Sequence, residues 1–417
     1  MHGKSDKNGD KFLNLNEEAI PMSQEENSAG RKVKSYFSVS FGLVLIDKML
    51  PYDLYINSST HAKREKFVRI FHKGNLLEGT DLEEFRRKYH QLYVDEAERD
   101  LYLQSLVKVD GAEDVQKAEV IKDSAISYLK SVFNSEHEFT NEVLDETIEG
   151  CRESVESMVD VIEDYDITDV HKLIGQLSFH DFYTYDHSIN VAMYSISILK
   201  ALNPKADRKD LVVAGMGGLL HDIGKIKIPT RIINNPGKLS DEDFQVIKDH
   251  PDFGYGLLCD HDCSHHEGVD FDIIKRVVHE HHENYNGTGY PNNLKGTEIS
   301  VYARITAIAD FYDAITTKRS YHEVLSTQDA LEVMSHSVGR KIDPKIFEVF
   351  KKNVNIILEG KSKIQLPDDF DPCQPQNILP FDKIGPKIQR SDFLKKDEQD
   401  FGRVKTDKKD NKKGRAS

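Results

Sequence analysis

The stretch Leu211-Val-Val-Ala-Gly-Met-Gly-Gly-Leu-Leu220 is apolar or small throughout, and it runs directly into His221-Asp-Ile-Gly-Lys225. An unbroken apolar run of this length is typical of a buried helix. The helix would end by presenting an imidazole and a carboxylate side by side, and such a pair can hold a metal ion. A His-Asp pair alone is common, so its meaning depends on the residues that accompany it.

Further imidazole and carboxylate side chains lie on both sides of this pair. We predict that they form one metal cluster with it, whose seven members are His187, His221, Asp222, His250, His281, His282 and Asp310. For any single histidine, a structural place in the core or on the surface is the commoner explanation. The whole set favours a shared site, because side chains from several helices can project into one bundle core.

The ligand types limit both the metal and the chemistry. Imidazole and carboxylate suit Fe, Mn, Co or Zn. The absence of Cys from the predicted ligand set argues against a structural zinc site. Five His and two Asp exceed the needs of one ion, so two ions that share the Asp222 carboxylate fit better. Two metals about 3.5–4 Å apart can acidify a water between them and stabilise both oxygens of a phosphoryl displacement. The cluster therefore predicts phosphodiester hydrolysis by a metal-bridged hydroxide.

The region from 166 to 357 has a helical period with short connections, so we expect a mainly α protein with an all-helical metal-binding bundle here. The predicted helices lie near 168–178, 181–201, 208–222, 240–258, 270–283, 298–316, 327–338 and 344–357. The sole extended piece that we expect in this region is a short one at 226–229.

A small α/β module is predicted at 34–105, before the bundle. Alternating apolar residues indicate strands at 36–46, 53–57, 67–71 and 92–94, and Asp81 is the expected cap of a helix between the last two. Because these residues form no recognisable site, we expect a regulatory accessory module that could contact a signalling protein.

A helical connector is predicted at 106–165, since long runs without Pro carry apolar residues on one face. Such helices can pack on themselves, transmit signals or form a homodimer.

The composition of the 417-residue chain excludes some functions. A formal net charge of −15 argues against binding to duplex nucleic acid, which favours a basic face. Four Cys with no paired framework indicate reduced thiols. No stretch is apolar enough for a signal core or a membrane span, so we expect a cytoplasmic protein without membrane insertion. Polar composition predicts disorder at 1–33 and 358–417.

The motifs resemble those of the HD-GYP branch of the HD phosphohydrolases. The resemblance covers about 166–357 and rests on several short motifs, which include Asp186-His-Ser188, His221-Asp-Ile-Gly-Lys225, His250-Pro251, His281-His-Glu283, Gly287-Thr-Gly-Tyr-Pro291 and Ala303-Arg-Ile-Thr-Ala-Ile-Ala-Asp310. Active members of that family hydrolyse cyclic dinucleotides, chiefly cyclic di-GMP, to linear pGpG or GMP.

The resemblance implies roles for individual residues. The seven side chains named above would bind two divalent ions, with Fe or Mn expected. Lys225 and Arg319 would contact substrate phosphates, and Asp313 would support the site or orient water. Gly289 and Tyr290 would shape a loop over the substrate, with Gly287 and Gly289 adopting backbone conformations closed to other residues.

Three departures from the family pattern leave alternatives open. Tyr183 replaces a Glu that accompanies a third metal, which favours two ions. Asn284 and Asn286 replace a base and an acid near the loop that carries Gly289-Tyr-Pro291, here called the GYP loop. His322 replaces a basic residue. These changes favour, as alternatives, a cyclic dinucleotide receptor with little turnover, or a phosphohydrolase for another nucleotide.

Overall fold

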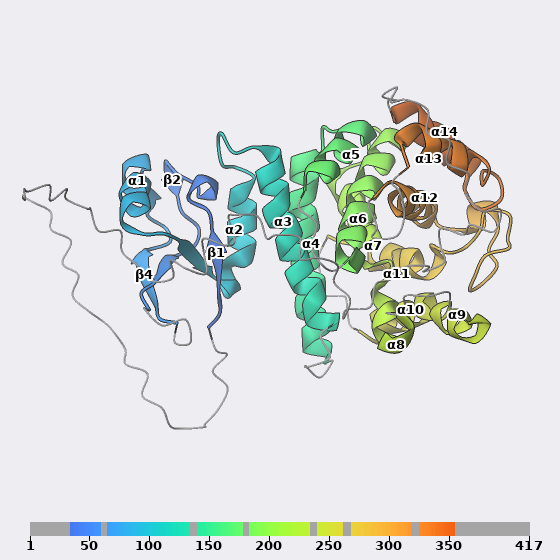
Figure 1. Ribbon diagram of the computed structural model, residues 1–417, viewed down its shortest axis with the longest axis horizontal. Helices are drawn as coiled ribbons and strands as arrows, with labels where there is room; N and C mark the ends of the chain where they lie inside the picture. Colours follow the sequence, from blue (N-terminus) through green and yellow to red (C-terminus); the bar gives the residue numbers. More distant parts are fainter. Residues whose placement is uncertain are drawn as a thin grey trace, which may run out of the picture. The chain divides into compact units, whose positions relative to one another are not determined.

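The computed structural model describes residues 34–59, 65–133, 140–177, 183–233, 240–261, 268–317 and 325–354 (Figure 1). The disorder predicted at 1–33 and 358–417 falls outside these ranges. Within them the protein is mainly helical, with a small sheet near the N-terminus, so the predicted fold class is confirmed.

The N-terminal module contains an antiparallel four-stranded sheet of order β1-β6-β3-β4. Its strands are β1 (Tyr36–Val39), β3 (Leu54–Asn57), β4 (Phe67–Phe71) and β6 (Leu92–Asp95). A two-stranded ribbon joins β2 (Lys48–Met49) to β5 (Leu76–Leu77). The helices of this part are α1 (Gly79–Lys88) and α2 (Arg99–Leu106), both drawn in blue in Figure 1. All four residues of β6 are buried, as expected for a central strand.

Two local predictions for this module are wrong. The strand predicted at 36–46 ends at Val39, and a 3-10 helix follows at Phe41–Leu43. Alternation fails there because consecutive side chains from Leu43 to Leu45 are all buried. Asp81 is not the cap of α1 either. Glu78 is the N-cap residue, and its backbone N–H donates to Asp81 Oδ2 at 3.1 Å, so Asp81 completes a capping box from inside the helix.

The connector consists of α3 (Asp114–Phe133) and α4 (Asn141–Ile162), as the helical period predicts. These helices pack against each other, and α4 also packs on a helix of the bundle, α7 (Arg208–Leu220). Their buried apolar side chains belong to the same continuous core as those of the bundle. Cover from a second subunit is therefore not required, and dimerisation through the connector stays a prediction.

The bundle is built around α6, α7 and α12, which pack on one another. Its helices are α5 (Ile167–Gln176), α6 (Tyr183–Leu202), α7, α8 (Thr230–Ile233), α9 (Asp241–Ile247), α10 (His250–Asp260), α11 (Phe271–Glu280), α12 (Val301–Thr316), α13 (Thr327–Ser335) and α14 (Pro344–Asn353). Every residue from Leu211 to Leu220 is buried, which explains why this stretch is apolar on all sides. No helix in the described ranges is long and apolar enough to cross a bilayer.

Two predictions for the bundle are corrected. The helix predicted at 240–258 is two helices, because Pro251 lies in the first turn of α10 and has no N–H to continue α9. The first half of the extended piece predicted at 226–229 belongs to a 3-10 helix, η3 (Ile223–Lys227), and Ile228 is extended before α8. The first change places His250 at the start of a helix rather than within one.

A buried ion pair joins the connector to the bundle. Lys122 Nζ of α3 lies 2.7 Å from Asp186 Oδ1 of α6, and both side chains are 2% exposed. The contact is an ion pair rather than an aligned hydrogen bond. Because Asp186 directly precedes His187, the pair fixes the start of the helix that carries a predicted metal ligand.

We expect Lys122→Ala to lower the free energy of unfolding by about 3 to 5 kcal/mol, because it leaves a buried carboxylate without its counter-charge. The double variant Lys122→Ala/Asp186→Ala should lose less than the sum of the two single variants. Chemical denaturation measures each value. The exposed pair Lys172–Asp169 is the control, since Lys172→Ala should cost no more than about 1 kcal/mol. Equal losses at the two lysines would contradict the account.

Glu153 of α4 gives the fold a dependence on pH. Burial, then the negative charges of Asp100 and Glu149, raise the pKa of Glu153 to about 8. Its carboxylate therefore binds a proton in the folded state at pH values where the unfolded chain has released it. The stability that this proton contributes is complete below the unfolded pKa and is lost as the pH rises through about 8.

We expect Glu153→Gln to stabilise the protein more at pH 9 than at pH 5, since Gln carries no charge at either pH. Thermal unfolding at both pH values measures the difference. The exposed Glu332 of α13 is a matched control, because Glu332→Gln should shift the unfolding midpoint equally at the two pH values. A gain in thermal stability from Glu153→Gln that does not change with pH would show that the ionised Glu153 carboxylate does not destabilise the fold.

Candidate metal centre

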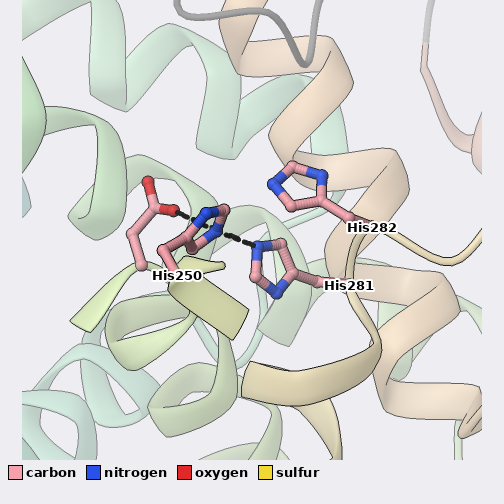
Figure 2. A group of neighbouring side chains, drawn as sticks. His250, His281 and His282 are labelled. Atoms are coloured by element: carbon pink, nitrogen blue, oxygen red, sulfur yellow. Dashed lines mark hydrogen bonds and ion pairs between the residues drawn. The ribbon is translucent and has the colours of Figure 1, made fainter. Parts of the chain in front are cut away.

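Two groups of possible metal ligands meet at one carboxylate. Asp222, His250, His281 and His282 form the first group, and His187, His221 and Asp222 form the second. Within each group the ligand atoms all lie within 4.8 Å of one another. Figure 2 shows the imidazoles of His250, His281 and His282 gathered at the first group. The structure therefore brings the predicted His ligands together with Asp222 as the shared member.

The ligands come from the ends and the middle of different bundle elements. His221 is the C-cap residue of α7, and Asp222 follows it at the start of η3. His250 is the first residue of α10, while His281 and His282 directly follow α11. Asp310, on α12, is 8% exposed, and His187, on α6, is 7% exposed. The apolar helices thus surround a small polar cluster.

Three imidazoles are held by backbone carbonyl groups three residues earlier in the chain. His221 Nδ1 lies 2.7 Å from the Gly218 carbonyl oxygen, and His250 Nδ1 lies 2.8 Å from that of Ile247. His281 Nδ1 lies 2.9 Å from the Val278 carbonyl oxygen. A carbonyl can only accept, so each Nδ1 donates its proton and each Nε2 of a neutral ring keeps a free lone pair.

These free nitrogens converge on Asp222. His221 Nε2 lies 3.2 Å from Asp222 Oδ2, whereas His250 Nε2 lies 3.3 Å from Asp222 Oδ1. The Nε2 atoms of His250 and His281 are 3.1 Å apart. Because the Nδ1 atoms of both rings donate to carbonyl oxygens, the Nε2 lone pairs of two neutral rings would point at each other across this distance. Such an arrangement fits a bound cation, which would accept both lone pairs.

The second group has an acidic support. His187 Nε2 lies 3.1 Å from Asp310 Oδ1, and His187 Nδ1 lies 2.7 Å from Asp313 Oδ2. Asp313 is fully buried and also accepts from Asn190 Nδ2 at 2.9 Å and Thr317 Oγ1 at 2.6 Å. Asp313 thus fixes the orientation of the His187 ring from behind, as carboxylates behind metal-bound imidazoles do. Its contacts are those of a positioning residue.

The charges of the site follow from burial and from these carboxylates. Burial disfavours a charged His187, but hydrogen bonds to Asp310 and Asp313 outweigh it and raise its pKa to about 9. Burial and the neighbouring imidazoles hold the pKa values of His281 and His282 well below the usual range. Those two rings are therefore neutral near pH 7, the form that binds metal.

His282 differs from the other imidazoles. Its Nδ1 atom is buried and has no hydrogen-bond partner in the described part of the chain. The ring of Tyr290 stacks on it, with centroids 4.9 Å apart and planes inclined by 29°. An unsatisfied buried nitrogen of this kind fits a ring whose binding partner is a ligand rather than a protein group.

Two glycines allow the backbones at the site to approach closely. A Cβ on Gly224 would lie 1.9 Å from the His250 carbonyl oxygen, so only glycine lets η3 contact the start of α10. A Cβ on Gly289 would lie 2.1 Å from the Asn284 backbone nitrogen. Gly287 has φ +84°, as predicted, but Gly289 is required for close packing and not for an unusual φ.

The GYP loop is anchored by a residue to which the sequence assigned no role. Glu283 is 4% exposed and accepts from the backbone N–H groups of Asn292 at 2.6 Å and Leu294 at 3.0 Å. Asn286 Oδ1 accepts from the backbone N–H and the hydroxyl of Thr288 at 3.1 and 2.7 Å. Asn286, one of the two asparagines that depart from the family pattern, therefore stabilises a turn of this loop.

The other predicted site residues fall into two sets. Lys225 Nζ lies 2.5 Å from Asp222 Oδ2, so in this structure it contacts the shared carboxylate. Arg319, His322 and the side chain of Tyr183 lie outside the described residues. Sequence reasoning missed Asn190, although its position one helical turn after His187 was a signal for a shared face.

Comparisons with known proteins agree with these motifs. Residues 178–346 match the protein family described as HD domain. The chain is 39% identical over 187 residues to "Cyclic di-GMP phosphodiesterase PA4108" of Pseudomonas aeruginosa, covering 44% of this chain and 42% of that protein. It is 32% identical over 189 residues to "3'3'-cGAMP-specific phosphodiesterase 3" of Vibrio cholerae, covering 45% and 39%. The chain therefore spans less than half the length of these relatives.

A solved structure is similar over more of the chain. Bd1817, described as a HDG"Y"P protein from Bdellovibrio bacteriovorus, is 20% identical and covers 76% of this chain and 99% of its own, with a TM-score of 0.41.

Because Asp222 is the member that both ligand groups share, we expect its loss to affect two ions and the loss of His187 to affect one. Dialysis against Mn²⁺ or Fe²⁺, followed by elemental analysis, should give about two ions for the unaltered protein, about one for His187→Ala and fewer still for Asp222→Ala. His171→Ala is the control, since His171 is a half-buried histidine that contacts Tyr194 and belongs to neither ligand group. Full metal content in Asp222→Ala would contradict a shared carboxylate.

Proposed function

Residues 178–346 match the HD domain family, and from this premise we propose that the chain is a metal-dependent phosphodiesterase that hydrolyses cyclic di-GMP to linear pGpG, to GMP or to both. This match agrees with the family resemblance drawn from the motifs. The activity rests on the site, and the observation that carries it is the position of Asp222, whose two oxygens face imidazoles of two different ligand groups.

This arrangement supports two ions rather than one. Asp222 Oδ1 would serve the group of His250, His281 and His282, while Oδ2 would serve the group of His187 and His221, beside which Asp310 lies. When bound, two divalent ions supply an acidified water and stabilise the charge that develops at phosphorus. Fe or Mn suits a set of imidazoles and carboxylates without thiolates.

The protein's own side chains have separate tasks in this proposal. The backbone carbonyls behind His221, His250 and His281 keep each Nε2 aimed inward. Asp313 holds the His187 ring. Lys225 shares Asp222 Oδ2 with the proposed ion, so binding of that ion would repel the ammonium and free it for a substrate phosphate.

The substrate is proposed from the loop and from the relatives' names. Glu283 holds the loop that carries Tyr290, and Tyr290 stacks on His282 at the edge of the first ligand group. A nucleotide phosphate that reached the ligands would therefore lie next to an aromatic ring. A contact between Arg319 and phosphate stays a prediction, as do the cytoplasmic location and a signalling partner for the N-terminal module.

The direct test is incubation of metal-loaded protein with cyclic di-GMP under reducing, anaerobic conditions, with products separated by chromatography. We expect linear pGpG or GMP. Asp222→Ala should abolish the reaction, and Asp313→Asn should slow it about 10- to 100-fold, because it loosens a ligand without removing one. The exposed Asp164→Ala is the control and should leave the rate unchanged.

The alternatives give different results in the same assay. Tight binding of cyclic di-GMP without product would indicate a receptor. Hydrolysis of 3'3'-cGAMP in its place would indicate a phosphodiesterase for another nucleotide. Neither binding nor product with any cyclic dinucleotide, in protein that retains its two ions, would contradict the proposed substrate class.

A further inference from the structure

Lys248 lies beside the metal centre without belonging to it. It is the C-cap residue of α9, two positions before His250, and its side chain is half-buried. Its Nζ atom lies 4.9 Å from the ring centroid of Phe244 and 5.5 Å from that of Tyr290. The ammonium is therefore held by two aromatic faces, an arrangement that stabilises a cation without neutralising it.

The same tyrosine connects Lys248 to the proposed ligands. Tyr290 has Lys248 over its ring, and its ring stacks on His282 with centroids 4.9 Å apart. Tyr290 therefore contacts both Lys248 and a predicted metal ligand. A molecule that reached the centre past Tyr290 would pass close to this positive charge.

Lys248 also differs from other lysines near the centre in its partners. Lys225 contacts Asp222 at 2.5 Å, and Lys122 contacts Asp186 at 2.7 Å. No carboxylate pairs with Lys248 among the residues that the structure describes. Its ammonium keeps its three N–H donors for another acceptor, and the aromatic contacts limit the conformational freedom that binding would cost.

We propose that Lys248 binds the phosphate of the cyclic dinucleotide that is not being cleaved. This inference rests on the proposed function. A cyclic dinucleotide carries two phosphodiester groups, and only one of them can lie at the shared Asp222 carboxylate. The other requires a cation at a distance from the ions, and an ammonium is a suitable point charge for it. Lys248 would then select cyclic dinucleotides over esters with a single phosphate.

Two substrates separate this role from a structural one. Bis(p-nitrophenyl) phosphate has one phosphodiester, so it can use the metal centre without reaching Lys248. For Lys248→Met, we expect the KM for cyclic di-GMP to rise about 10- to 100-fold, the loss typical of one hydrogen bond to a charged group. The kcat and KM for bis(p-nitrophenyl) phosphate should stay within about twofold. Lys248→Arg should restore most of the affinity for cyclic di-GMP.

One control variant and two contrary outcomes complete the comparison. Lys275→Met removes a lysine of α11 that pairs with Asp272, and it should change neither substrate's kinetics. If Lys248 only packs Tyr290 in place, Lys248→Met will impair both substrates alike because the loop moves, and the inference is overturned. Unchanged kinetics with cyclic di-GMP would overturn it as well while leaving the proposed function intact.

Binding measurements separate the inference from the proposed function. If the unaltered protein binds cyclic di-GMP without cleaving it, calorimetry should still show weaker binding to Lys248→Met, and the inference holds although the activity fails. Equal affinity of the two proteins in that case overturns the inference. If the unaltered protein neither binds nor cleaves cyclic di-GMP, both proposals fall.

Discussion

The position of the Asp222 carboxylate is the constraint on which the site depends. One oxygen faces His221 and the other faces His250, so the two ligand groups can exist together only if this carboxylate stays between them. The position comes from the fold, because Asp222 follows a helix whose last ten residues are all buried. The apolar run that forms the core therefore also delivers the polar pair to a fixed place.

Helix ends do much of the work that orients the ligands. His221, His250 and His281 each donate Nδ1–H to a carbonyl three residues earlier, so local backbone geometry sets their tautomers. Longer-range contacts complete the site. Gly224 lets η3 approach His250, and the buried Lys122–Asp186 pair fixes the start of the helix that carries His187. The connector thus contributes to ligand geometry from outside the bundle.

Much of this could be predicted from sequence. Helical periods located most helices of the bundle, and the repeated His and Asp residues named a ligand set that the structure brings together. The departures have physical causes. The 240–258 helix splits because Pro251 cannot donate a hydrogen bond, and the strand at 36–46 stops early because three consecutive side chains there enter the core. Neither effect can be predicted from hydrophobic periodicity alone.

Contacts between distant residues were beyond the reach of the sequence. The role of Glu283 depends on backbone N–H groups nine and eleven residues away, and that of Lys248 depends on a loop 42 residues later. The sequence predicted that position 289 requires glycine, but it attributed this to an unusual backbone conformation. The requirement arises because the backbone of Asn284 packs against Gly289. Such features become visible only when the chain is folded.

The most direct test of a shared carboxylate is anomalous X-ray scattering from crystals of the protein grown with Mn²⁺. The account predicts two anomalous peaks about 3.5–4 Å apart, one on each side of Asp222, with His187 and His221 at one and His250, His281 and His282 at the other. A single peak, or two peaks that do not share Asp222, would contradict it.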